Sequence, residues 1–172
     1  MDTAFLISAF VTLFVIIDPI GLTPIFIALT PGMTAQQRPA IALRPTLISA
    51  ALLFLFAFFA EQVLGFIGIS MPAFRIAGGI LLFLTALDML FERRTKRRED
   101  QAEYEDAPDP SVFPLAIPLI AGPGAIASMI LLTGQAEGTL GMVSVLSVMV
   151  AVLVLVFLFF LSATLVERAL GK

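Results

Sequence analysis

The chain alternates long apolar stretches with short polar segments. A helix that crosses a bilayer needs about 20 apolar residues. Five stretches meet this length, and they run from about Thr3 to Leu29, Ile41 to Leu64, Pro72 to Phe91, Val112 to Thr133 and Met142 to Val166. The pattern therefore predicts an all-α membrane protein, a multi-pass helical bundle with five spans in this chain.

Two of the five stretches contain residues that interrupt helices. The first is broken by Asp18-Pro19-Ile20-Gly21 and the fourth by Ala121-Gly122-Pro123-Gly124. A helix over residues 3–17 rises only about 22 Å, which is less than the roughly 30 Å hydrocarbon core. The first break is thus expected inside the membrane, where irregular backbone is tolerated only against protein or a water-filled cavity.

The two broken stretches also resemble each other. A shift of 103 residues places Gly21 on Gly124 and Thr30 on Thr133, and the same shift aligns the second stretch with the fifth. Apolar matches arise easily by chance in membrane segments, so the shared Gly and Thr positions carry the case for a repeat. The units start on opposite sides of the membrane, which makes the repeat inverted, as in many secondary transporters.

The repeat divides the chain into a first three-span unit (residues 1–91), a linker (92–111) and a second unit (112–172) that holds two spans. The linker is basic, then acidic, then rich in Pro, so we expect it to be solvated. A counterpart of the third span would begin beyond Lys172, and we expect the second unit to be incomplete here.

Composition and charge agree with a membrane protein and give its orientation. Hydrophobic residues make up 59% of the chain and charged residues 13%, against about 25% charged in soluble domains. Placing the N-terminus outside puts nine of the ten basic residues inside, all except Arg75, as the positive-inside rule requires. We therefore expect a bacterial inner (plasma) membrane protein with a cytoplasmic Arg93–Arg98 loop. The first stretch is not a cleavable signal, because it lacks a basic start.

Several kinds of chemistry are excluded. The chain has no Cys and no His, so thiolate or imidazole metal sites, Cys nucleophiles and His bases are ruled out. No phosphate-binding loop of the GxxxxGK[ST] type is present. We expect no enzyme, no cofactor, no metal and no nucleic-acid partner.

Asp18 is the residue with the clearest chemical potential. One interpretation makes it the N-cap of a half-helix that begins at Pro19. The other makes it a proton or cation site, because an acid inside the membrane is a functional residue by default. An intramembrane aspartic protease is disfavoured, since Asp88 lies near an edge of the membrane and neither acid follows a Gly.

The second break has no acid, and its meaning stays open. Its N–H groups start a half-helix and could face an anion; its small residues could instead permit a close helix crossing. Arg75 could snorkel to the outer interface, and Gly78-Gly79 permits close helix contact. Four hydroxyls could line a path or bond their own helix, namely those of Thr23, Thr30, Ser128 and Thr133.

Local signals around the second stretch predict how that helix begins. Thr34 to Gln37 reads as a capping box at its start, Pro39 is tolerated in the first turns, and Pro45 should kink the helix.

The sequence resembles the MarC family over essentially all of its length. The resemblance rests on IIDPIGLTPIFIALTPGMT, MPAFRIAGGILLFLTALDML and PLAIPLIAGPGAIASMILLTG. It implies a six-span inner-membrane protein related in architecture to small-solute exporters, so this chain looks C-terminally truncated. The motif positions are Asp18, Pro19, Gly21, Arg75, Gly78, Gly79, Gly122, Pro123 and Gly124, and no catalytic role attaches to any of them.

We therefore expect secondary transport or export of an unknown small solute through the lipid bilayer. The alternative is a non-transporting membrane protein with a structural or regulatory role, and a homo-oligomer is left open. The expected substrate or ion pathway comprises Asp18, Pro19, Gly21, Thr23, Arg75, Gly122, Pro123 and Gly124.

Overall fold

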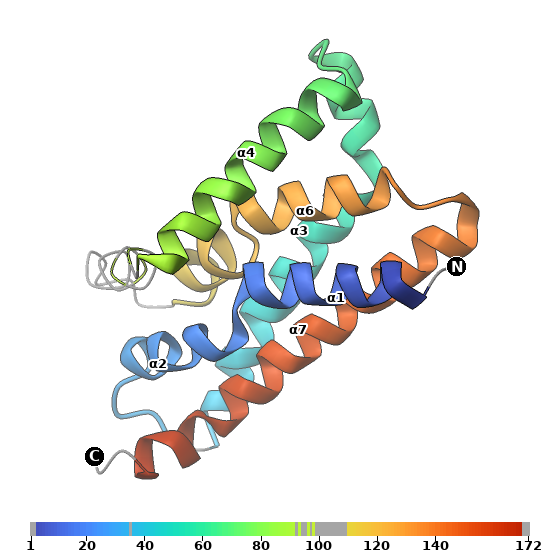
Figure 1. Ribbon diagram of the computed structural model, residues 1–172. Helices are drawn as coiled ribbons and strands as arrows, with labels where there is room; N and C mark the ends of the chain where they lie inside the picture. Colours follow the sequence, from blue (N-terminus) through green and yellow to red (C-terminus); the bar gives the residue numbers. More distant parts are fainter. Residues whose placement is uncertain are drawn as a thin grey trace.

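The computed structural model describes residues 3–34, 36–91, 93, 96, 98 and 110–169, and within them it is helical without a strand (Figure 1). The all-α fold class is confirmed. The elements in chain order are α1 (Thr3–Ile17), α2 (Pro19–Leu29), α3 (Arg38–Phe66), α4 (Met71–Leu90), the π-helical segment η1 (Ser111–Ile120), α6 (Pro123–Thr133) and α7 (Gly138–Ala169).

These elements confirm the predicted spans. Within the described residues, four helical segments are long and apolar enough to cross a membrane, and the first of them joins α1 and α2 as Thr3–Leu29. A fifth crossing results if η1 and α6, which meet at an angle of 53°, form one broken span. The division into two units and a linker stays a prediction, because most of residues 92–109 lies outside the described part of the chain.

The connection between α3 and α4 follows from its sequence. Gly68 has a φ of 75°, and the Ile69 N–H donates to the Leu64 carbonyl at 2.8 Å, which is the Schellman ending of a helix. The Ser70 hydroxyl then accepts the Ala73 N–H at 3.3 Å and caps α4. The chain reverses here within four residues.

The capping box expected at the start of α3 forms only in part. The Gln37 side chain accepts the Thr34 N–H at 3.0 Å, as a capping box requires. The Thr34 hydroxyl, however, also donates to the Gln37 side chain instead of accepting a backbone N–H. The helix begins at Arg38, three residues later than the box implies, and Gln37 provides no side-chain cap. Pro39 lies in the first turn, as expected, and Pro45 lies within a helix that continues to Phe66.

The first half of the fourth span is not a regular α-helix, and this was not predicted. Phe113 and Ile117 have extended backbone angles (φ −126°, ψ 132° and φ −128°, ψ 123°). Each of them precedes a proline, Pro114 and Pro118, and proline pushes the residue before it out of the α region. Two prolines one turn apart therefore give an irregular segment inside the span.

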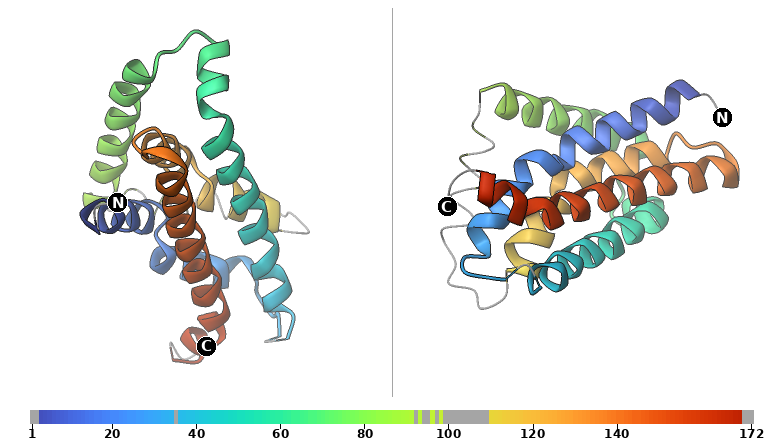
Figure 2. Two further views of the ribbon diagram at one scale, coloured as in Figure 1. Left: turned by 90° about the vertical axis from the view of Figure 1, so that its right-hand side faces the viewer. Right: turned by 90° about the horizontal axis from the view of Figure 1, so that it is seen from below.

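The α6 helix occupies the centre of the bundle. It packs against α1, α3, α4 and α7, and Figure 2 shows it between α3 and α4, which diverge from their connection. The α1, α2 and α3 helices all pack on α7, and the Phe26 ring stacks on Phe160 with centroids 4.3 Å apart. The outer surface is apolar, with Ile76, Ile80 and Phe83 of α4 more than half exposed. Such a surface suits lipid.

The ends of the helices alternate as crossings of a membrane should. The N-terminal end of α1 lies near the connection between α6 and α7, at the right of Figure 1. The ends of α2, α4 and α7 lie toward the opposite side. The relative directions of the spans therefore match the predicted order.

Candidate functional site

Asp18 forms the break between α1 and α2. Among the described residues other than glycine, Asp18 alone has a positive φ, at 61°. This is the left-handed region, which Asp tolerates better than most side chains. Its carboxylate Oδ1 accepts the Gly21 N–H at 3.0 Å, so Asp18 caps α2, with Pro19 in the first turn. The expected cap is confirmed.

The break also releases a backbone carbonyl. In an uninterrupted α-helix the Gly21 N–H would donate to the Ile17 carbonyl. That N–H donates instead to Asp18, so the carbonyl of Ile17 is left for another donor. Gly21 is required here because a Cβ at this position would collide with the Asp18 carboxylate.

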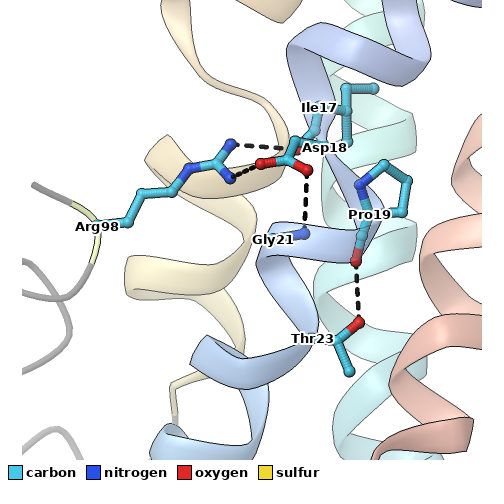
Figure 3. Close-up of polar contacts among 6 residues, drawn as sticks. All are labelled: Ile17, Asp18, Pro19, Gly21, Thr23 and Arg98. Atoms are coloured by element: carbon cyan, nitrogen blue, oxygen red, sulfur yellow. Dashed lines mark hydrogen bonds and ion pairs between the residues drawn. The ribbon is translucent and has the colours of Figure 1, made fainter. Parts of the chain in front are cut away.

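The other donor is Arg98, which follows α4 in the chain (Figure 3). Its Nη1 pairs with Asp18 Oδ2 at 3.0 Å, and its Nη2 donates to the Ile17 carbonyl at 3.1 Å. The side chain of Arg98 is 7% exposed and that of Asp18 is 28% exposed. A largely buried guanidinium thus binds the two oxygens that the break presents.

This role of Arg98 was not predicted from the sequence. There Arg98 belongs to the expected cytoplasmic loop and bears only on topology. One signal was available, since an acid inside a membrane generally pairs with a partner. The choice among five nearby basic residues could not be made without the fold.

The second break lies against the end of α1. A Cβ on Gly124 would meet Ile16 Cγ2 at 3.2 Å and the Thr85 hydroxyl at 3.8 Å. Gly122 has no room for a side chain, because a Cβ there would collide with the Pro118 carbonyl oxygen. Two interpretations were left open for this break, an anion site and a close helix crossing. The contacts of Gly124 show the close crossing.

A cavity of about 240 Å³ borders the second break and the end of α1 next to the first break. Its wall includes Ile16 beside the first break, the Gly122–Ala125 segment of the second, and Arg98. Thr85 and Asp88 of α4 complete the polar part of the lining. Of the eight residues expected in the pathway, Gly122, Pro123 and Gly124 line this cavity, and Asp18 is linked to it through its pair with Arg98.

Arg75, another of the eight, lies elsewhere. Its Nη2 donates to the Gly134 carbonyl at 3.1 Å, and Gly134 is the C-cap of α6. A cation at a helix C-terminus is favourable because it offsets the partial negative charge there. Arg75 thus caps the far end of α6, and nearby Gly78 lets Leu131 approach α4 closely.

Most of the candidate hydroxyls bond their own helices. Thr23 donates to the Pro19 carbonyl at 2.9 Å, and Thr30 and Thr133 make the equivalent bond one turn back. Ser128 differs, since its buried hydroxyl has no hydrogen-bond partner in the described structure. It lies one turn after Gly124 in α6, on the same helix face.

The geometry can hold a cation at a carboxylate and a carbonyl. Among the described residues no three His, Cys, Asp or Glu side chains gather closely enough to hold a metal ion. In that part of the chain, the break binds an organic cation, which is the guanidinium of Arg98.

A family comparison identifies the protein class. The model of the MarC family, described as an integral membrane protein family, matches residues 3–172. The chain belongs to the MarC family. It is an integral membrane protein by that membership, which agrees with the four or five candidate spans among its described residues.

Three relatives illustrate how MarC sequences compare with this chain. A UPF0056 membrane protein of Methanocaldococcus jannaschii is 44% identical over 87% of this chain and 68% of its own length. The UPF0056 membrane protein YvbG of Bacillus subtilis is 35% identical over the whole chain and 83% of its own length. The UPF0056 inner membrane protein YhgN of Escherichia coli is 36% identical over 79% of this chain and 68% of its own length.

The names of these MarC relatives specify a membrane protein and no activity. No solved structure matches the chain. Any function must therefore be argued from the site itself.

Proposed function

We propose that this MarC protein takes part in secondary transport or export of a small solute, without catalysing a chemical reaction. The observation that carries the proposal is the meeting of two broken spans beside one cavity, which is lined by Arg98, the cation of a charged pair with Asp18. Irregular backbone inside a membrane usually lines a cavity or a substrate path. A buried ion pair is costly to assemble, which favours a functional reason for its presence.

The packing supports the inverted repeat on which such transporters are built. The repeat relates α1 to η1, α2 to α6 and α3 to α7. The contact of α2 with α7 then corresponds to that of α6 with α3, and the contact of α1 with α7 corresponds to that of η1 with α3. The contact of α3 with α7 corresponds to itself, and the contacts of α6 with α1 and with α4 fall outside this correspondence. Aligning the two half-helix starts requires Pro19 on Pro123, one residue away from the alignment of Gly21 on Gly124.

The proposed location is the inner (plasma) membrane, as the name of YhgN states for that relative. The basic residues support an N-terminus outside and a cytoplasmic segment around Lys96 and Arg98. This orientation places the cavity nearer the cytoplasmic side, because it lies at the end of α4 that leads into Arg98.

A structural or regulatory role is the competing function. It is favoured by the observation that Asp18 already serves as a helix cap and that its ion pair ties α1 to the segment after α4. Transport requires the break between α1 and α2 for solute movement, whereas a structural or regulatory role involves no solute movement that depends on it.

The test is metabolite profiling of cells that lack or overproduce the gene. If the chain transports, at least one small solute changes in opposite directions inside the two strains. A variant with Pro19→Ala and Gly21→Ala heals the break and should abolish the change while it still inserts in the membrane. Identical profiles in all strains, at matched protein levels, would leave the structural role as the better explanation.

A further inference from the structure

The break between α1 and α2 creates a binding site for an organic cation, here called the receptor, and the guanidinium of Arg98 occupies it. The receptor has two oxygens: Asp18 Oδ2 at 3.0 Å and the Ile17 carbonyl at 3.1 Å from two nitrogens of one guanidinium. Both oxygens depend on the unusual backbone at Asp18, which caps α2 and releases the Ile17 carbonyl. A carboxylate and a carbonyl both accept hydrogen bonds, so together they suit an NH-bearing cation.

A cavity lies beside this receptor. Apart from Arg98, its described charged lining residue is Asp88. Arg98 therefore links the cavity, which it lines together with Asp88, to the Asp18 carboxylate, which lies outside the lining. The volume of about 240 Å³ corresponds to on the order of eight water molecules, which is enough for a small solute.

We infer that Arg98 occupies the substrate site and that the substrate class is a small organic cation bearing a guanidinium or a primary ammonium group. The inference rests on the proposed transport function and names the solute class for it. The guanidinium of Arg98 then competes with the solute for Asp18 and the Ile17 carbonyl.

The effect of this competition on the affinity for a free cation can be estimated. A group tethered to the same chain reaches its site at an effective concentration in the millimolar range or above. A free cation can bind only in molecules from which the Arg98 guanidinium has left the site. Its apparent affinity is therefore the intrinsic affinity multiplied by the fraction of molecules in which the site is open. Removing the guanidinium should therefore strengthen cation binding by about tenfold or more.

The experiment measures binding of radiolabelled guanidinium to the purified protein in detergent by scintillation proximity. The wild type is compared with Arg98→Gln, with Arg98→Gln combined with Asp18→Asn, and with Arg75→Gln. Arg75 is the matched control, since its guanidinium also donates to a backbone carbonyl but lies away from the cavity. If Arg98→Gln is not monodisperse, Arg98→Lys takes its place, because one ammonium makes fewer contacts than a guanidinium and competes less.

We expect Arg98→Gln to bind guanidinium about tenfold more tightly than the wild type, and added Asp18→Asn to remove that gain. Arg75→Gln should match the wild type, and unlabelled methylammonium, but not acetate, should compete. Equal binding in wild type and Arg98→Gln, or a gain that survives Asp18→Asn, overturns the inference. So does binding of radiolabelled acetate that depends on Arg98, which would make this an anion site.

The binding result is separable from the proposed transport. Cation binding without any solute change in the profiling strains would contradict transport and leave the cation site in place. A solute change confined to anions would support transport and contradict the cation site.

Discussion

Gly21→Ala tests whether the break is held by the cap that the structure shows. The Gly21 N–H lies 3.0 Å from Asp18 Oδ1, and an added Cβ would lie 2.9 Å from the Asp18 carboxyl carbon and closer still to Oδ2. Real Cβ atoms do not make such contacts. The carboxylate must therefore leave its position, and both the cap and the pair with Arg98 are disturbed.

The expected cost follows from three contributions. Loss of an N-cap costs about 1 kcal/mol. Weakening the partner of a largely buried guanidinium costs about 2 kcal/mol, below the range for fully buried pairs because Asp18 is 28% exposed. Replacing Gly by Ala inside a helix returns up to about 1 kcal/mol. We therefore expect a net destabilisation of about 2 kcal/mol.

Gly79→Ala is the matched control. Gly79 also lies in a helix, and no atom lies within 4 Å of the Cβ it would gain, so this variant should equal or exceed wild-type stability. The assay is unfolding in mixed micelles by titration with a denaturing detergent, followed by far-UV circular dichroism. Wild-type stability of Gly21→Ala, or an equal loss in Gly79→Ala, would refute the role given to the cap.

Three further predictions concern charged residues. Asp18→Asn should keep the cap, since Asn caps about as well as Asp, and should reduce solute export at least tenfold if the charge is used; full export would leave Asp18 as a cap only. Arg75→Ala should lower the free energy of unfolding by about 1 kcal/mol or less, because the bond to the Gly134 carbonyl is lost. Guanidinium binding should be unchanged, and a loss of binding would place Arg75 in the pathway after all. In intact cells an impermeant thiol reagent should label a cysteine at position 137 and not at Lys96, in a chain free of background thiols; the reverse pattern would invert the topology.

The sequence predicted the parts of the fold that depend on local chemistry. Apolar length gave the spans, and Asp18-Pro19 gave the first break, because proline removes an N–H and Asp can replace the missing acceptor. The irregular η1 segment depends on equally local rules. Pro114 and Pro118 lie one turn apart in an apolar run, so this prediction was available and was missed.

The missing part of the site depends on contacts between distant segments. Arg98 lies 80 residues from Asp18 in sequence, and its own neighbours contain further basic residues. Nothing local distinguishes it from them. Arg75 shows the same limit, since its partner Gly134 comes from another span and only the packing of α4 on α6 brings the two together.

The two breaks differ in backbone and in charge. Asp18 is left-handed, with φ 61° and ψ 66°, whereas Gly122 is extended, with φ −82° and ψ 172°. At the second break no acid could stand at Gly122, because the Pro118 carbonyl fills the space of any side chain. At the first, Asp18 supplies a carboxylate that is satisfied by a cap bond on one oxygen and an ion pair on the other. A repeat with identical breaks would offer two equivalent ion sites. If the protein takes a cation as inferred, charge selection then rests on Asp18 and on the guanidinium that it binds, and the close contacts of the second break add shape.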